Sequence, residues 1–404
     1  MTSGGETAPD ADEHSRRKAS AGFKVNEGYV ITTAPHAPPF RADQVGSLLR
    51  PAHLIEARQK HRKRLIESAE LRRIEDDAIR EVVALQESIG LHSISDGEFR
   101  RQSYIVDFFR KAVGPGGLTA EPGDFVHRNE RGETIPIEKL VIHRPVRWTG
   151  PIFAEHLAFL KSITRRTPKM TVPSPIILHF LGGNDAILRE AYASLDQFWS
   201  DVIEVYRNEL AALRKAGCAY LQVDETSLVK FGDPEIRAVI ERRGDDWRKL
   251  VETYVDVINA VLSCAPADMT IGIHVCRGNR RGFWQADTGY EFMANQLFRR
   301  LKAKFYFLEF DSPRAGPLDA LRLMPDDKTV VLGLVTTKSP ALEDKEVLRK
   351  RIKEASAYIA PERLCLSPQC GFSGNVGNTV MTADEQFAKL RLVVETARSL
   401  WAEP

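Results

Sequence analysis

From about residue 39 onward, short apolar runs alternate with long amphipathic stretches. In the stretch Leu71–Ile89, apolar residues recur every three or four positions, which predicts a helix with one buried face, and Gln197–Lys215 shows the same spacing. The short runs are rich in β-branched residues and predict strands. The eight predicted strands are Phe40–Ser47, Leu91–Glu98, Pro175–Phe180, Tyr220–Glu225, Met269–Cys276, Phe305–Phe310, Thr329–Val335 and Arg363–Cys370.

The alternation of strands and helices favours βαβ units and therefore a parallel sheet. Eight such units predict an α/β fold, a closed (β/α)8 TIM barrel, as one catalytic domain over residues 39–404. Residues 1–38 are rich in Gly, Ser, Ala, Pro and charge, so we expect a disordered N-terminal tail. Residues 114–148 do not fit a βα unit, and they predict an insertion after the second unit, either a hairpin or a lid.

Polar residues gather where the predicted strands end, which is the end that carries the active site in TIM barrels. A purely structural barrel does not require thiols, an imidazole and several carboxylates at the ends of nearly all its strands. These residues are Ser47, Asp96, Glu98, Asp224, Glu225, His274, Cys276, Glu309, Lys338 and Cys370.

The pair His274 and Cys276 offers a metal-binding pattern, because residues two apart on a strand point to the same side. Alone, this pattern is more typical of a buried cysteine beside a core histidine than of a metal site. In a closed barrel, however, Glu309 and Cys370 end other strands at the same rim. One nitrogen, two sulfur and one oxygen donors suit Zn²⁺ better than Mg²⁺, so we predict a zinc site at these four residues.

A zinc ion with two thiolate ligands is suited to holding a third, substrate thiolate, which stays nucleophilic at neutral pH. We therefore expect a small thiol substrate and a small-molecule alkyl donor. Glu98, Asp224 and Glu225 are candidates for binding an ammonium group, although ion pairs on the barrel rim would also account for them. Arg277 and Asn279 follow the metal motif, and they are candidates for binding a substrate carboxylate or sulfonate.

Composition narrows the class of protein. The 404 residues are 43% hydrophobic and carry a net charge of +2 from 57 basic and 55 acidic residues, which gives no support for a nucleic-acid partner. Five cysteines do not form a secreted disulfide framework, and no apolar run predicts a membrane span or signal peptide. We expect a cytoplasmic enzyme with no membrane partner.

Seven motifs together resemble the cobalamin-independent methionine synthase family, and in particular the short, single-barrel relatives of its catalytic domain. The order and spacing of these motifs cover nearly all of residues 39–400. They are FRADQVGSLLRP, SDGEFRR, YLQVDET, HVCRGN, FLEFDSPRAG, VLGLVTTKSP and LSPQCGFSGN.

This resemblance implies methyl transfer from a methyl-folate-type donor to a thiol such as homocysteine, with zinc as cofactor. It places the metal on the four residues already selected. It also implies that Gly46, Ser47, Glu98 and Asp224 bind the thiol substrate. Where the methionine synthases carry a histidine thought to assist proton transfer, this chain has Lys338, so Lys338 is a candidate catalytic residue alongside Glu309.

Other functions fit the same residues. A related single-barrel group joins coenzyme M to epoxides at a similar zinc, so another thiol and another electrophile form the alternative. A non-catalytic zinc-binding barrel and a metal-free decarboxylase are further alternatives, and the matched set of metal donors counts against the decarboxylase.

Overall fold

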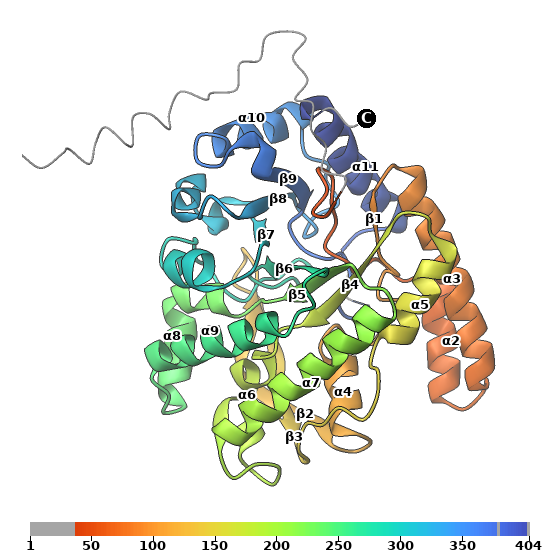
Figure 1. The fold of residues 1–404 in the computed structure, drawn as a ribbon, viewed down its shortest axis with the longest axis vertical. Helices are drawn as coiled ribbons and strands as arrows, with labels where there is room; N and C mark the ends of the chain where they lie inside the picture. The colour runs from red at the N-terminus through yellow and green to blue at the C-terminus, as the bar shows by residue number, and fades with distance from the viewer. Residues whose placement is uncertain (1–36, 378–379, 402–404) are drawn as a thin grey trace, which may run out of the picture.

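The computed structural model describes residues 37–377 and 380–401, so the predicted tail lies outside the described residues except for its last two positions. A parallel sheet of seven strands curls at the centre, and helices cover its outer face (Figure 1). The strand order is β1-β4-β5-β6-β7-β8-β9. These strands span β1 Ser93–Ile94, β4 Thr167–Pro173, β5 Tyr220–Asp224, β6 Thr270–Val275, β7 Phe305–Glu309, β8 Thr329–Val335 and β9 Leu364–Pro368.

The first predicted strand does not form a regular strand. Segment 40–47 makes one isolated parallel bridge, from Ala42 to Leu366 of β9. On its other side, the Ser95 hydroxyl donates to the Gly46 carbonyl at 2.6 Å. The segment therefore lies between the two ends of the sheet, and the structure shows a curled seven-stranded parallel sheet where the sequence predicted eight strands.

The third predicted strand, Pro175–Phe180, is wrong. The strand at this position in the sheet is β4, and the apolar run that follows begins helix α6, Ile177–Ile187. A short apolar run does not distinguish a buried helix from a buried strand, and this helix is buried on nearly all sides. The sequence of β4 was less conspicuous because it contains two prolines and Lys169.

The helices have the amphipathic character that the sequence predicted. Predicted helices Leu71–Ile89 and Gln197–Lys215 are confirmed as α3 and α7. The last helix begins with a capping box between Thr382 and Glu385. These three helices span α3 Ser68–Ser88, α7 Leu195–Lys215 and α11 Ala383–Leu400. The described residues also form the α-helices α2 Ala52–Arg62, α4 Val106–Val113, α5 Ala154–Ile163, α8 Pro234–Arg242, α9 Trp247–Ser263 and α10 Lys345–Ala355.

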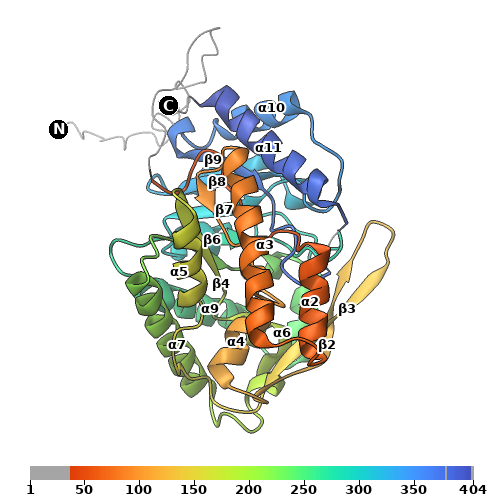
Figure 2. The same ribbon diagram turned by 90° about the vertical axis from the view of Figure 1, so that its right-hand side faces the viewer.

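The predicted insertion contains an antiparallel hairpin, β2 Leu118–Arg128 and β3 Thr134–Ile142, at the edge of the molecule (Figure 2). The hairpin packs on α6, where the rings of Phe125 and Phe180 stack at 5.0 Å. Glu209 of α7 fixes the chain that returns from the hairpin, because its carboxylate accepts hydrogen bonds from the backbone of Ile152 and Phe153. The hairpin therefore has a defined place against the sheet domain.

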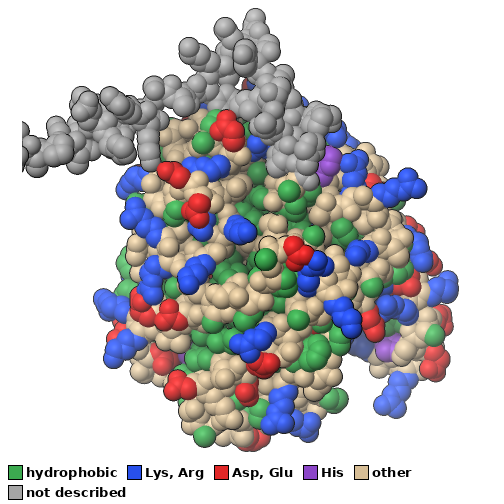
Figure 3. Space-filling view, viewed as in Figure 1, with side chains coloured by type: hydrophobic (Ala, Val, Ile, Leu, Met, Phe, Trp, Pro, Cys, Tyr) green, Lys and Arg blue, Asp and Glu red, His purple; other side chains and the backbone are tan. Residues whose placement is uncertain are grey.

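Apolar side chains fill both faces of the sheet. The larger cluster lies between the sheet and the helices, and a smaller one, which includes Tyr220, Phe305, Phe307 and Val331, lies inside the curl. On the face shown in Figure 3, basic and acidic side chains are interspersed. No helix in the described part of the chain has the length and apolar character needed to cross a membrane.

Gly272 of β6 leaves the space that the Phe305 ring occupies, since a β-carbon at this position would lie 1.8 Å from that ring. We expect Gly272→Ala to lower the free energy of unfolding by about 1–3 kcal/mol or more, because overpacking a core costs that much. Urea denaturation measures this change. Lys302→Ala at an exposed position serves as the control, and equal stability of the two variants would contradict the packing seen here.

Candidate active site

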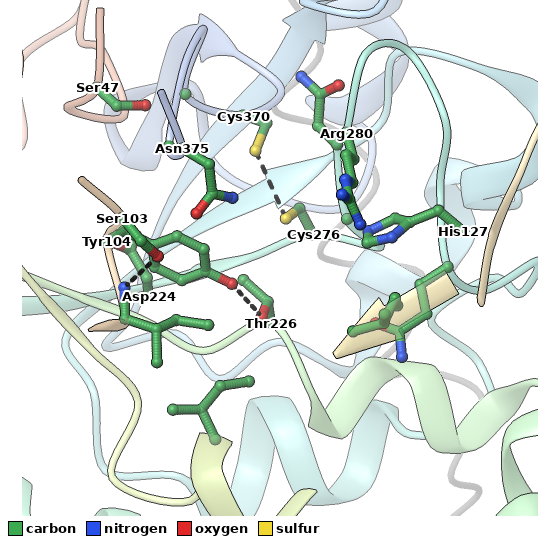
Figure 4. Close-up of a pocket in the computed structure, with 18 of the residues that line it drawn as sticks. Ser47, Ser103, Tyr104, His127, Asp224, Thr226, Cys276, Arg280, Cys370 and Asn375 are labelled. Carbon is green, nitrogen blue, oxygen red and sulfur yellow. Dashed lines mark hydrogen bonds between the residues drawn. The ribbon is translucent and has the colours of Figure 1, made fainter. Parts of the chain in front are cut away.

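A cavity of ≈ 500 Å³ opens at the carboxyl ends of the strands (Figure 4). Its floor includes Asp224, His274, Cys276 and Cys370, which lie at or just after the ends of β5, β6 and β9. The hairpin forms one wall with an apolar surface that includes Ile135, Ile137 and Leu140. The cavity therefore lies at the end of the sheet where the sequence predicted the chemistry.

Three potential metal ligands meet at the floor of the cavity. One ring nitrogen of His274 and the sulfur atoms of Cys276 and Cys370 all lie within 4.8 Å of one another. The two sulfur atoms face each other at 3.7 Å and are not joined by a disulfide bond (Figure 4). Cys276 and Cys370 are 94 positions apart in the chain, so the curled sheet is what brings them together.

The imidazole of His274 is oriented by a carboxylate. Its Nδ1 lies 3.0 Å from Oδ1 of Asp224, and its buried Nε2 has no hydrogen-bond partner in the described residues. A histidine that gives one nitrogen to a carboxylate and leaves the other free is the usual arrangement beside a bound metal. The residues present therefore fit a zinc ion, with one nitrogen and two sulfur donors.

The charges of these three groups depend on one another. Burial lowers the pKa of His274, but Cys276 and Asp224 outweigh this effect and raise it to about 10. The hydrogen bond with Cys370 lowers the pKa of Cys276 well below its ordinary value, against the opposing effect of burial. The same contact raises the pKa of Cys370. The site therefore favours a thiolate at Cys276, the form in which cysteine binds metals.

Glu309 lies outside the three-ligand group. Its carboxylate accepts hydrogen bonds from Nζ of Lys338 at 2.8 Å and from the backbone N–H of Arg277 at 2.6 Å. Although burial raises the pKa of Glu309, Lys338 and Arg277 together lower it to about 2. The structure thus brings three of the four predicted ligands together and shows the fourth as an ion-paired carboxylate.

Two carboxylates, those of Glu98 and Asp224, face the cavity beside the three potential metal ligands. Glu98 accepts a hydrogen bond from the Thr171 hydroxyl at 2.7 Å and has a buried Oε2 atom without a partner in the described residues. Burial raises the pKa of Glu98, and Asp224 also raises it against the effect of Arg101. Glu98 is held in this place by a left-handed backbone with φ of 61°. A cation placed between the two carboxylates would relieve their repulsion.

The predicted glycine–serine loop borders the same carboxylate. Gly46 has φ of 141°, and a β-carbon there would lie 2.6 Å from the Thr171 side chain, so the close approach requires glycine. Ser47 lines the cavity. Glu225 does not, because its carboxylate accepts hydrogen bonds from the backbone of the turn that follows β5.

The structure places two predicted polar residues away from the cavity wall. The guanidinium of Arg277 is fully buried and donates to backbone carbonyls, including that of Ala315, so it is not available for a substrate carboxylate. The ammonium group of Lys338 forms ion pairs with the carboxylates of Glu309 and Asp311. Asn279 does line the cavity, and its side-chain amide donates to the Thr337 hydroxyl at 2.8 Å.

Sequence reasoning missed several cavity residues, namely Tyr104, His127, Lys230 and Arg280. His127 lies on the hairpin, whose docking could not be deduced from periodicity. Tyr104 follows the SDGEFRR motif, and Lys230 follows the YLQVDET motif closely. Because Tyr104 and Lys230 lie so close to motifs that contain candidate site residues, their positions in the sequence could have identified them as cavity residues.

Comparisons with known proteins identify the family. Residues 40–399 match the profile of the family described as "Cobalamin-independent synthase, Catalytic domain". The Bacillus subtilis protein YxjH is 37% identical over 377 residues, which cover 90% of this chain and 95% of YxjH. A methionine synthase from Pyrococcus furiosus is 23% identical over 327 residues, with 81% of this chain and 84% of that protein covered.

A solved structure agrees with these matches. A Listeria monocytogenes protein assigned as a vitamin-B12-independent methionine synthase is 33% identical, with a TM-score of 0.69, and the match covers 91% of this chain and 99% of that one. The resemblance seen in the motifs is confirmed. The chain therefore belongs to the cobalamin-independent methionine synthase family.

Proposed function

We propose that this protein is a zinc-dependent S-methyltransferase that moves a methyl group from a methyl-folate-type donor to a small amino-acid thiol such as homocysteine. The observation that carries the proposal is the meeting of His274, Cys276 and Cys370 beside two cavity carboxylates. The printed name of the Pyrococcus furiosus relative, methionine synthase, supports the same reaction.

We propose that His274, Cys276 and Cys370 hold the zinc, with Glu309 as a fourth ligand. When bound, zinc supplies Lewis acidity that lowers the pKa of a substrate thiol. Asp224 keeps the tautomer and direction of the His274 ring fixed through the 3.0 Å contact. Lys338 and Arg277 hold Glu309 ionised at the edge of the group.

The remaining residues bind and orient the thiol. Glu98 and Asp224 receive its ammonium group, and Ser47 contributes a hydroxyl from the same wall. We infer that segment 40–47, which carries Gly46 and Ser47, acts as the closing strand of an eight-stranded barrel. The hairpin covers the cavity and limits the access of water. The two carboxylates disfavour an anionic thiol of the coenzyme M type, which ranks that alternative second.

The metal proposal makes a direct prediction. We expect about one zinc per chain in purified protein, and we expect the double variant Cys276→Ser, Cys370→Ser to retain almost none, because both sulfur donors are lost. Metal analysis by plasma mass spectrometry measures this. Cys264→Ser, a half-buried cysteine away from the cavity, is the matched control. Full zinc content in the double variant would exclude this site.

The role of Asp224 is tested by Asp224→Asn. An amide in this place weakens the orientation of His274, so we expect zinc affinity to fall by about 10–100-fold, the usual effect of losing such a partner. Competition with a chelating dye gives the affinity. An unchanged affinity would show that Asp224 does not support the metal ligand.

Recognition of the ammonium group is tested by Glu98→Gln. A hydrogen bond to a charged group contributes about 1.5–3 kcal/mol, so we expect KM for homocysteine to rise by about 10-fold or more. The matched probe is 4-mercaptobutanoate, which is homocysteine without its amino group. Both enzymes should use it equally poorly, and an equal loss with both thiols would instead indicate a general defect of the site.

A further inference from the structure

We propose that Lys230 is a catalytic residue that protonates the leaving group of the alkyl donor. This inference rests on the proposed function and deepens it, because it assigns the step that the sequence had attributed to Lys338. It is carried by where the two lysines lie and by what each of them contacts.

Lys230 lies in the 3-10 turn Leu228–Gly232, directly after β5. The residue is 3% exposed, and it lines the same cavity as Cys276 and Cys370. Its Nζ donates to Oε1 of Gln285 at 2.5 Å. No carboxylate forms an ion pair with it in residues 37–377 and 380–401. A buried ammonium group in the cavity wall with a neutral partner has protons available for a ligand.

Lys338 has the opposite environment. Its Nζ donates to Glu309 at 2.8 Å and lies 3.4 Å from Asp311, and the residue does not line the cavity. A proton held by two carboxylates is difficult to transfer, so the geometry favours Lys230.

The electrostatic surroundings of Lys230 point in the same direction. Burial lowers the pKa of Lys230 to about 8, while the acidic groups nearby, Cys276, Glu225, Glu309 and Cys370, partly oppose this effect. An acid of this strength is protonated near neutral pH and yet gives up its proton far more readily than an exposed lysine.

The other proton-bearing groups of the cavity wall are poorer acids. Burial, with Lys230 and Arg280 as further causes, lowers the pKa of His127 to about 3, so this ring is neutral at physiological pH. Burial raises the pKa of Tyr104. Arg280 carries a guanidinium group, which does not lose its proton in proteins. Lys230 is therefore the most suitable donor of a proton within this wall.

The proposed step conserves atoms, electrons and charge. The thiolate sulfur forms a bond to the methyl carbon while the bond from that carbon to the donor nitrogen breaks, and the electron pair of the broken bond stays on nitrogen. That nitrogen takes a proton from the Lys230 ammonium. The proton released earlier by the thiol restores the ammonium through solvent, so the overall reaction converts a thiol and an N-methyl amine to a thioether and an amine.

The test compares two donors with homocysteine as acceptor. The nitrogen of 5-methyltetrahydrofolate needs a proton when it leaves, whereas the iodide of methyl iodide does not. We expect Lys230→Met to lower methionine formation from the folate by about 10²-fold or more, the usual contribution of a general acid. We expect the rate with methyl iodide to stay within about 3-fold of wild type, because that step uses no proton.

Two further variants keep the test decisive. Lys230→Arg preserves the charge but not a transferable proton, so it should show the same loss with the folate. Lys302→Met, an exposed lysine before β7, should behave as wild type. Melting temperature and zinc content are measured for each variant.

Several outcomes would overturn the inference. An equal loss with both donors would show that Lys230 is structural, and a normal folate rate in Lys230→Arg would exclude it as the acid. If wild type uses methyl iodide alone, thiol activation survives but the proton-donor role falls. If wild type forms methionine from neither donor, the proposed function itself fails, and the inference fails with it.

Discussion

Asp43 joins the two ends of the sheet through its carboxylate and its backbone N–H. It is fully buried and accepts hydrogen bonds from Ser93 of β1 at 2.7 Å and from Tyr220 of β5 at 2.7 Å. It also pairs with Lys169 of β4 at 3.3 Å. The backbone N–H of Asp43 donates to Leu366 of β9 at 2.9 Å. Asp43 thus connects the first segment to three strands through its side chain and to a fourth through its backbone.

This interaction supports the curl of the sheet, on which the arrangement of the candidate site residues depends. Cys370 follows β9, and the other two proposed ligands belong to β6 and its end, so their meeting requires the sheet to keep its curl. Buried charges are costly to desolvate, and removing one partner of such a pair typically costs about 3–5 kcal/mol. The Asp43–Lys169 pair is accordingly a stronger constraint on geometry than on net stability. Its loss would widen the gap that segment 40–47 spans.

The sequence predicted most of the sheet because five of its strands are apolar runs that end in polar residues. It misplaced the third strand for a physical reason. Lys169 is polar in sequence yet buried in the curl, where its Nζ lies 3.9 Å from the centre of the Phe307 ring. Periodicity contains no information about such a pair, since the partner Asp43 lies 126 residues away.

In the candidate site, too, the sequence predicted the positions of residues on strands but not the contacts of long side chains. Strand alternation was enough to place His274 beside Cys276, and the curl brought Cys370 to them. The contacts of long side chains could not be deduced. Arg277 follows the metal motif but turns into the core, over the ring of Tyr290 at 4.4 Å. Glu309 was predicted as a ligand from its strand position, and its partners Lys338 and Arg277 became visible only in three dimensions.

The charged groups that line the cavity are consistent with the two substrates of the proposed reaction. Glu98 and Asp224 line the cavity, and so do the basic groups Lys230 and Arg280. An amino-acid thiol with an ammonium group is attracted to the two carboxylates. A donor whose nitrogen becomes negative in the transition state is stabilised by the basic groups. The cavity thus contains groups of both signs, as the charges that develop in the proposed reaction require.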